Sequence, residues 1–194
     1  MIDDHLTWQS HLSLISGRIR KLLYVFKNLR TVANFSLLIK TYKALAESLL
    51  CYCICVWGGA AQVHFIPLER AQRAVLKVIM SLPIRHPTTL LHNTTKTLSV
   101  RKLFIYQIIR RFHSKSVPNL PLDTNKRVKR YQVPFTNTRF GKRSYNYLAP
   151  KIYNMLQNKL NLLQYNSRQI KEPLAKYLLN LNKIDTDYLI TPLL

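Results

Sequence analysis

The chain has 194 residues, of which 47% are hydrophobic, enough for one packed domain or for one domain with a loosely attached tail. Thirty basic residues accompany eight acidic ones, which gives a formal charge of +22. This composition excludes wholesale disorder and favours a polyanionic partner, with nucleic acid as the first candidate and an anionic membrane surface as the second.

The cysteines and the first residues predict neither a metal centre nor a secretory signal. Cys51, Cys53 and Cys55 alternate along a predicted helix, so successive thiols point to different faces, and no histidine lies near them. We interpret them as small buried hydrophobes in a reducing, intracellular compartment, the nucleus or the cytoplasm. Residues 1–11 are polar and acidic where a secretory signal requires an apolar run. The four glycines form no phosphate-binding loop, and we expect no cofactor.

Asp3 and Asp4 invite a catalytic interpretation, because paired carboxylates bind the metal ions of phosphoryl-transfer enzymes. The next carboxylate along the chain is Glu47. We therefore interpret the pair as part of a solvated turn or a helix cap, and we expect no catalytic residues. The segment 1–11 does not read as the natural beginning of a domain.

Residues 9–30 predict a basic amphipathic helix. Apolar residues recur at helical spacing from Leu12 to Leu29, and no acidic residue occurs in this segment. Surface helices usually carry charges of both signs. A basic face that only contacts solvent is therefore the weaker alternative to a basic face that binds a partner. Much of the remaining surface of this helix is occupied by Arg18, Arg20, Lys21 and Lys27.

The longest apolar run, from Tyr42 to Gly59, predicts a central core helix, which is capped by Asn34 or Ser36 and ends at Gly58 and Gly59. A membrane span is the competing interpretation, but Glu47 and Ser48 interrupt the run, which makes a span less favourable. The predicted core stripe is Leu38, Tyr42, Leu45, Leu49, Tyr52 and Val56, widened by Leu50, Ile54 and Trp57.

Two further helices are expected before residue 117. The first covers residues 65–82, with Pro67 in its first turn, and has Arg70, Arg73 and Lys77 opposite an apolar side. The second follows Ser99 and extends to about His113. The apolar side of the first is Leu68, Val75, Leu76, Ile79 and Leu82, and the basic residues of the second are Arg101, Lys102, Arg110, Arg111 and Lys115.

Residues 117–139 contain three prolines and no helical period, which predicts an extended basic linker or a mobile arm. Helices are expected from about Lys151, after Pro150, and from Ser167 to about Leu181, with frayed residues beyond. The expected fold class is therefore mainly α, a helical bundle over 1–116, the linker over 117–139 and a small helical C-terminal segment over 140–194.

Motifs occur in a characteristic order. Leu6-Thr7-Trp8 and His11 precede the first helix, Tyr52-Cys53 and Val56-Trp57-Gly58 end the central one, residues 68–75 read LERAQRAV, and Asn137-Thr138-Arg139 leads to Pro150-Lys151-Ile152-Tyr153-Asn154. This set resembles the region after the palm in reverse transcriptases of non-LTR retrotransposons, the LINE-like elements of the jockey and related clades. Ala149 departs from the glycine that usually precedes the proline.

The resemblance implies a thumb and C-terminal region of an RNA-directed DNA polymerase. Nothing in the chain resembles the paired aspartates of the palm or an endonuclease, so no polymerase activity is expected from this chain alone. The palm and fingers of the polymerase would then be a protein partner.

Two functions follow as hypotheses. In the first, the chain grips primer–template, as an RNA–DNA hybrid or a DNA duplex, without reading its sequence. In the second, it is a helical scaffold or binds anionic membrane surfaces. The candidate nucleic-acid-binding residues are Arg18, Arg20, Lys21, Lys27, Arg70, Arg73, Lys77, Arg110, Arg111, Lys126, Arg127, Lys129, Arg130, Arg139, Lys142, Arg143, Tyr145 and Tyr147.

Overall fold

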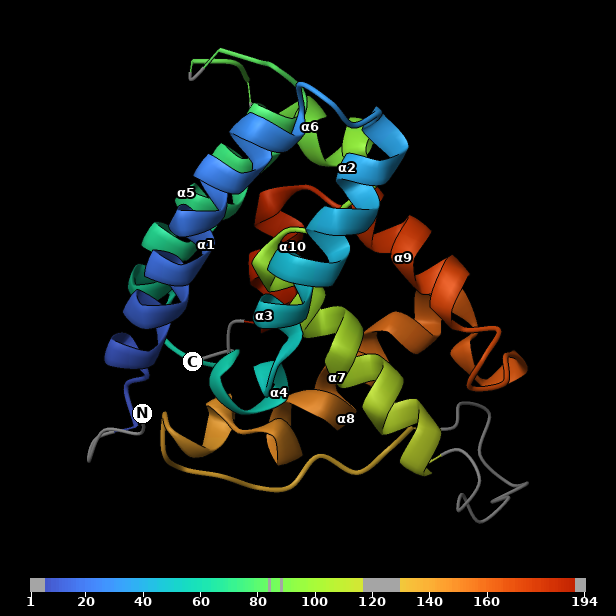
Figure 1. Cartoon of the computed structure of the whole chain (residues 1–194). Coiled ribbons are helices and arrows are strands. Elements are labelled where there is room, and N and C mark those ends of the chain that lie inside the picture. Colours follow the sequence, from blue (N-terminus) through green and yellow to red (C-terminus); the bar gives the residue numbers. More distant parts are fainter. Residues whose placement is uncertain (1–5, 84, 88, 117–129, 191–194) are drawn as a thin grey trace. The chain divides into compact units, whose positions relative to one another are not determined.

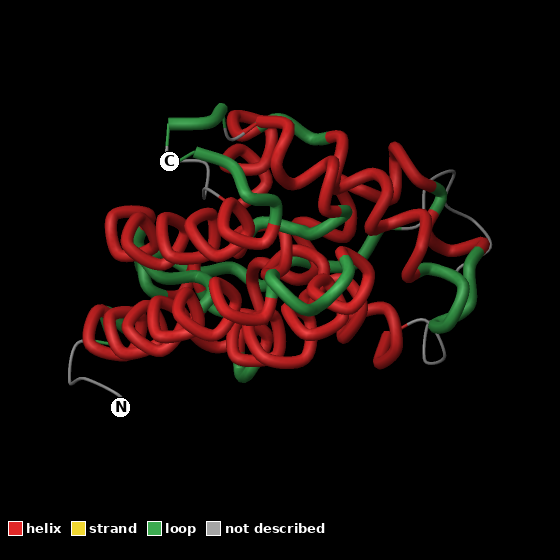
Figure 2. Tube along the Cα trace, turned by 45° about the horizontal axis from the view of Figure 1, so that its top comes forward, coloured by secondary structure: helices red, strands yellow, loops and turns green. Residues whose placement is uncertain are grey.

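The computed structural model describes residues 6–83, 85–87, 89–116 and 130–190. The chain is mainly α-helical, and none of these described residues lies in a strand (Figure 2). The predicted fold class is confirmed in this respect. Within the described part, no helix combines the length and the apolar character needed to cross a bilayer.

The structure divides into two compact units, Met1–Leu103 and Phe104–Leu194, and the division falls inside helix α7 (Val100–Ser116). The predicted domain limits, 1–116, 117–139 and 140–194, stay predictions. Most of the expected linker, residues 117–129, lies outside the described residues.

The first unit is built on two long helices, α1 (Gln9–Leu29) and α5 (Gln62–Ile79), which pack side by side (Figure 1). The guanidinium Nη1 of Arg30 donates to the carbonyl oxygen of Val78 at 3.4 Å, so the two C-terminal ends lie together and the helices run parallel. Each helix buries one apolar stripe, as the amphipathic pattern predicts. The expected helix over residues 9–30 is confirmed.

The central apolar run forms several short helices: α2 (Phe35–Tyr42), the π-helical turn η1 (Lys43–Glu47), α3 (Ser48–Cys51) and α4 (Ile54–Trp57). Asn34 caps α2, because its Oδ1 accepts from the Leu37 N–H at 2.9 Å. In the π turn the Ser48 N–H donates to the carbonyl oxygen of Lys43, five residues earlier. The prediction of one continuous helix is therefore wrong.

The π turn changes which side chains reach the core. Buried residues occur at steps of four: Leu38, Tyr42, Ala46, Leu50 and Ile54. In a regular α-helix each such step over-rotates by about 40°, and the wider π turn takes part of that rotation back. The predicted stripe is thus wrong in its second half, where Leu45 (41% exposed), Tyr52 and Val56 are exposed and Leu49 is half-buried.

The helix breaks at Tyr52 and Cys53. Tyr52 has an extended backbone and Cys53 adopts the left-handed conformation, with φ of 50°. Trp57 is fully buried, and its Nε1–H donates to the carbonyl oxygen of Tyr52 at 2.8 Å, so the broken turn supplies the acceptor that the indole requires. The prediction of three buried cysteines is wrong, because Cys53 is exposed at this break and Cys51 and Cys55 are only half-buried.

Helix α5 begins at Gln62, before the predicted start, and Pro67 lies inside it rather than in its first turn. The predicted apolar side is buried, except for Leu82, which lies beyond the helix and is half-buried. The short helix α6 (Thr89–Thr95) follows. Its end is closed by polar contacts, in which His92 Nδ1 lies 3.2 Å from the Thr97 carbonyl oxygen and Thr95 and Thr97 share a hydroxyl hydrogen bond of 2.7 Å.

The second unit contains the rest of α7, η2 (Gly141–Arg143), α8 (Tyr145–Leu160), η3 (Leu162–Gln164), α9 (Lys171–Asn180) and α10 (Lys183–Ile190). Helix α8 starts at Tyr145 and includes Pro150, so the predicted start near Lys151 is wrong. Helix α9 starts at Lys171 rather than Ser167. The expectation of frayed residues after Leu181 is wrong as far as Ile190, because Asn182 caps α10 by accepting from the Asp185 N–H at 2.7 Å.

The π turn leads to a test by matched substitutions. Leu50→Asp places an uncompensated charge in the core and should lower the free energy of unfolding by on the order of 3–5 kcal/mol. Leu45→Asp, on the exposed side, should cost less than about 1 kcal/mol. Urea titrations followed by circular dichroism measure both values, and equal costs would show that the buried stripe does not follow the four-residue steps.

His92 should make stability depend on pH. Burial lowers its pKa from 6.5 to about 4, although the hydrogen bond to the Thr97 carbonyl opposes this shift. Between these two pH values His92 is protonated in the unfolded chain but not in the folded chain. The contribution of His92 to the free energy of unfolding is therefore present above pH 6.5 and is lost as the pH decreases toward 4. From pH 6.5 to about 5, the loss should be roughly 2 kcal/mol larger for the natural chain than for His92→Gln. Parallel pH profiles for the two proteins would contradict this assignment.

Candidate nucleic-acid interface

The four candidate cations of α1 are all exposed, but they do not form one line. At 3.6 residues per turn, Arg20 and Lys27 lie nearly above one another, whereas Arg18 points about 160° away from Arg20. Lys21 lies between the two directions, opposite the buried stripe. Helix α1 therefore presents positive charge over its whole solvated side, which suits a polyanion of variable geometry better than one shaped ligand.

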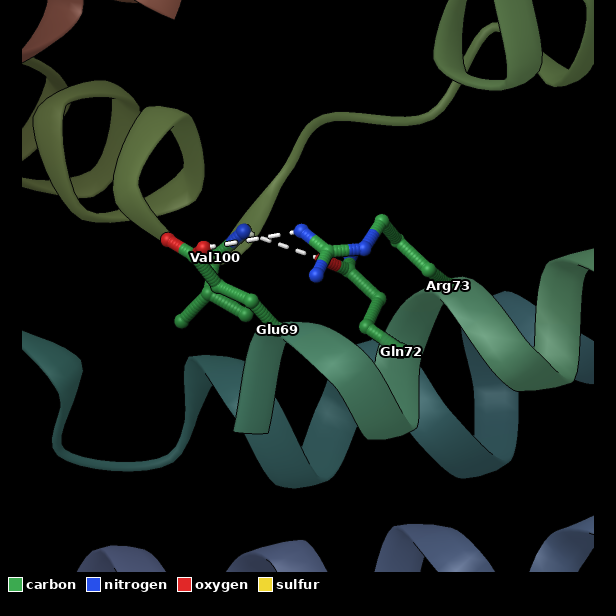
Figure 3. Close-up of polar contacts among 4 residues, drawn as sticks. All are labelled: Glu69, Gln72, Arg73 and Val100. Atoms are coloured by element: carbon green, nitrogen blue, oxygen red, sulfur yellow. Dashed lines mark hydrogen bonds and ion pairs between the residues drawn. The ribbon is translucent and has the colours of Figure 1, made fainter. Parts of the chain in front are cut away.

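Helix α5 separates its polar residues by side. Arg70 and Lys77 are seven residues apart and project opposite the buried stripe, Arg70 exposed and Lys77 half-buried. Arg73 lies on a flank, where its Nη1 is 3.6 Å from Oε2 of Glu69 (Figure 3). Of the three predicted cations, Arg73 is therefore already in an ion pair with a neighbouring carboxylate.

Gln72 holds α5 in place from the core side. Only 1% of this residue is exposed, and its amide makes three hydrogen bonds. Nε2 donates to the hydroxyl of Tyr42 at 2.9 Å and to the carbonyl oxygen of Leu98 at 2.8 Å, while Oε1 accepts from the Val100 N–H at 3.1 Å. Figure 3 shows this last bond, at the first residue of α7. One side chain thus joins α5 to the end of α2 and to the segment that starts α7.

Two basic residues at the start of α7 differ from the prediction that they decorate the helix surface. Arg101 is buried, with its Cζ 5.6 Å from the ring centroid of Phe65. Lys102 is half-buried, and burial lowers its pKa. A cation over an aromatic ring stabilises packing, so we assign Arg101 to the core of the first unit rather than to an interface.

In the second unit, basic side chains lie over the predicted tyrosines. The Cζ of Arg111 on α7 is 5.6 Å from the ring centroid of Tyr145, and the Nζ of Lys151 is 6.0 Å from that of Tyr147. Both tyrosines are half-buried. Arg110 likewise lies over a neighbour, 5.3 Å from the Tyr106 ring centroid. These tyrosines hold cations, and Tyr145 also joins α7 with α8 through Arg111, which leaves less of their rings for stacking on bases.

A buried aromatic cluster anchors the same two helices. His113 is fully buried, with Nδ1 2.8 Å from the Tyr153 hydroxyl and Nε2 2.9 Å from the Tyr165 carbonyl oxygen. Since a carbonyl only accepts, Nε2 carries the proton and Nδ1 accepts from Tyr153. Burial lowers the pKa of His113 and raises that of Tyr153. Both ring nitrogens are occupied, so this histidine is a structural residue rather than a general base.

The segment before η2 is held by Asn154. Its Oδ1 accepts from the Tyr131 N–H at 2.9 Å and its Nδ2 donates to the Tyr131 carbonyl oxygen at 2.8 Å. The Tyr131 ring lies edge-on to Phe112 and Tyr153, with centroids 4.8 and 5.2 Å away. Arg130, Arg139 and Arg143 are exposed and Lys142 is half-buried, whereas Lys126, Arg127 and Lys129 lie outside the described residues.

The structure therefore separates the candidate nucleic-acid-binding residues into two sets. It also indicates further candidates that the sequence analysis did not select. The first unit carries the cations of α1 and α5, and the second carries those of α7, α8 and the segment 130–143. The additions are Lys151, from its position over Tyr147, and Phe135 and Phe140, from their exposure among cations. A search for aromatic residues beside basic ones would have found Phe140, which follows Arg139, but not Phe135, which lies between Pro134 and Thr136.

No protein-family model matches the chain, and neither curated proteins nor solved structures give a match. Among the described residues, no group of His, Cys, Asp and Glu side chains could hold a metal ion. Asp3 and Asp4 lie outside the described residues.

Gln72→Leu tests whether the buried amide supports the arrangement of α5. The leucine would leave the Tyr42 hydroxyl, the Leu98 carbonyl and the Val100 N–H without this partner, at a cost on the order of 3 kcal/mol or more. Arg70→Leu, on the exposed side of the same helix, should change the free energy of unfolding by only about 0.5 kcal/mol. Chemical denaturation measures both, and a cost below about 1 kcal/mol for Gln72→Leu would mean that other groups or water replace the amide.

Proposed function

We propose that this chain binds nucleic acid through the phosphate backbone, as the thumb and C-terminal part of a retrotransposon RNA-directed DNA polymerase. The observation that carries the proposal is the placement of charge. Arg18, Arg20, Lys21, Lys27 and Arg70 are all exposed, on the sides of α1 and α5 that face away from the apolar core. With thirty basic and eight acidic residues, most cations have no carboxylate to neutralise them one to one.

Backbone binding suits this arrangement because phosphate contacts require charge and reach rather than a shaped pocket. Cations spread over the solvated side of a helix can follow a duplex in several registers, and such contacts carry no direct sequence information. The ligand would be an RNA–DNA hybrid or a DNA duplex, the compartment the nucleus or the cytoplasm, and the palm and fingers of the polymerase the protein partner. The chain itself would bind the nucleic acid and would not catalyse the reaction.

A second function, docking on a protein scaffold or an anionic membrane surface, is favoured by one observation. Near the turn from α3 to α5 the chain exposes Tyr52, Val56, Val63 and Ile66. Exposed apolar side chains in one region of the chain are typical of contact surfaces. This function predicts binding to anionic vesicles that depends on Val56 and Val63 as well as on charge.

The salt dependence of binding should test the proposal. The affinity for duplex DNA or an RNA–DNA hybrid, measured by fluorescence anisotropy from about 50 to 200 mM salt, should fall with a log–log slope of about −0.9 per phosphate contacted on B-DNA. Lys21→Ala and Arg70→Ala should each make the slope shallower by about one unit on any base sequence.

Lys40→Ala and Arg168→Ala are the matched controls, because both side chains are exposed and neither belongs to the candidate set. They should leave the slope unchanged. If all four substitutions had the same effect, the cations would form a merely solvated surface. Tight binding to anionic vesicles without nucleic-acid affinity would favour the second function instead.

A further inference from the structure

The segment between Tyr131 and α8 contains a tightly built turn. The Gly141 N–H donates to Oγ1 of Thr138 at 3.0 Å, and the Lys142 N–H donates to the Thr138 carbonyl oxygen at 3.1 Å. A Cβ at Gly141 would lie 2.9 Å from Thr138 Oγ1 and 3.1 Å from Thr136 Cβ, so only glycine allows this close approach. The Ser144 hydroxyl closes the turn by donating to the Gly141 carbonyl oxygen at 2.7 Å.

This turn exposes two phenyl rings among positive charges. Phe135 is 89% exposed and Phe140 is 54% exposed, and Thr136 contacts the position of Gly141, so the backbones that carry the two rings lie together. Arg139 and Arg143 beside them are exposed. No acidic residue occurs between Thr124 and Lys171. Exposed rings within a purely basic segment fit a ligand that combines planar faces with negative charge.

Other aromatic residues nearby do not offer the same surface. Tyr145 and Tyr147 have cations over their rings, and Tyr131 and Tyr153 pack against Phe112. Lys142 and Lys151 also lie close enough that, after burial, the charge of Lys142 further lowers the pKa of Lys151. An anion bound between or beside these two cations would reduce the repulsion between their charges.

We propose that Phe135 and Phe140 stack on unpaired nucleotide bases while Arg139 and Arg143 contact the adjoining phosphates. This proposal rests on the proposed function and adds a single-stranded ligand to it, since base faces are hidden inside a duplex. The turn would hold the unpaired part of a template or a strand end, while the helical cations hold duplex backbone. Gly141 is a positioning residue in this site, because it sets the turn without touching the ligand.

The probes are a labelled oligothymidine of about 12 nucleotides and a blunt duplex of similar length. Phe135→Ala and Phe140→Ala should each weaken binding of the single strand by roughly 5- to 100-fold, with the salt slope nearly unchanged. Duplex affinity should stay within about twofold of the natural chain, because phosphate contacts provide it. Tyr188→Ala removes a ring that is 57% exposed on α10 and is the matched aromatic control, with no expected effect.

Two further variants separate stacking from other contacts. Phe140→Leu keeps apolar surface but removes the ring, so stacking predicts a loss as large as for alanine, whereas an apolar or lipid contact predicts retained binding. Gly141→Ala changes no ring and no charge, yet it should weaken single-strand binding by displacing the turn. Circular dichroism and duplex affinity report whether each variant still folds.

The possible results distinguish the two proposals. Salt-dependent duplex binding together with silent phenylalanine substitutions would overturn the stacking site and leave the proposed function standing. Absence of binding to both probes would overturn both. If the phenylalanine variants lost affinity for anionic vesicles but not for the oligothymidine, the turn would be a lipid contact and the stacking proposal would be wrong.

Discussion

The first unit depends on one buried amide. Gln72 lies on the core side of α5 and offers two donors and one acceptor to the end of α2 and to the segment that starts α7. Apolar packing alone would hold α5 against α1, but such packing is non-directional and tolerates sliding and rotation. A fully satisfied buried amide has one geometry, and any shift of α5 would leave polar groups unpaired at a cost of about 1–3 kcal/mol each. The rotation of α5, and hence the outward direction of Arg70 and Lys77, follows from this constraint.

Charge and core are arranged in a consistent way around that helix. A net charge of +22 opposes compaction, because like charges repel one another. The structure lessens this repulsion by spreading the α1 cations over all solvated directions and by placing Arg101, Arg110, Arg111 and Lys151 over aromatic rings. The aromatic residues of the basic segments therefore have two physical roles. Some rings hold cations, and others, Phe135 and Phe140, are exposed and could stack on a ligand as we propose.

The helices themselves were largely predictable because their signals are local. The apolar periodicity of residues 9–30, the Asn34 cap and the alternation of basic and apolar residues along α5 depend on neighbours within a few positions. Prolines misled the prediction of helix starts, since Pro67 and Pro150 both lie inside helices that begin earlier. Proline lacks a donor and is best tolerated in the first turn, but packing of the surrounding helix can outweigh the lost hydrogen bond.

By itself the sequence determined the helical class, the excess of positive charge and the approximate positions of α1, α5 and α7. It also favoured a polyanionic partner, which stays a prediction. The π turn at Lys43–Glu47 and the break at Cys53 were not predicted from the sequence, because the apolar pattern alone favoured one continuous helix. The burial of Arg101 was decided by tertiary structure, because it depends on contact with Phe65, which is distant along the chain. The same holds for the candidate site. Composition names the cations and aromatic residues, but only packing decides that Arg111 and Lys151 lie over Tyr145 and Tyr147. It also decides that Phe135 and Phe140 are exposed beside a turn in which Gly141 closely approaches Thr136 and Thr138. A ring's availability is a property of its neighbours in space, which the order of residues does not specify.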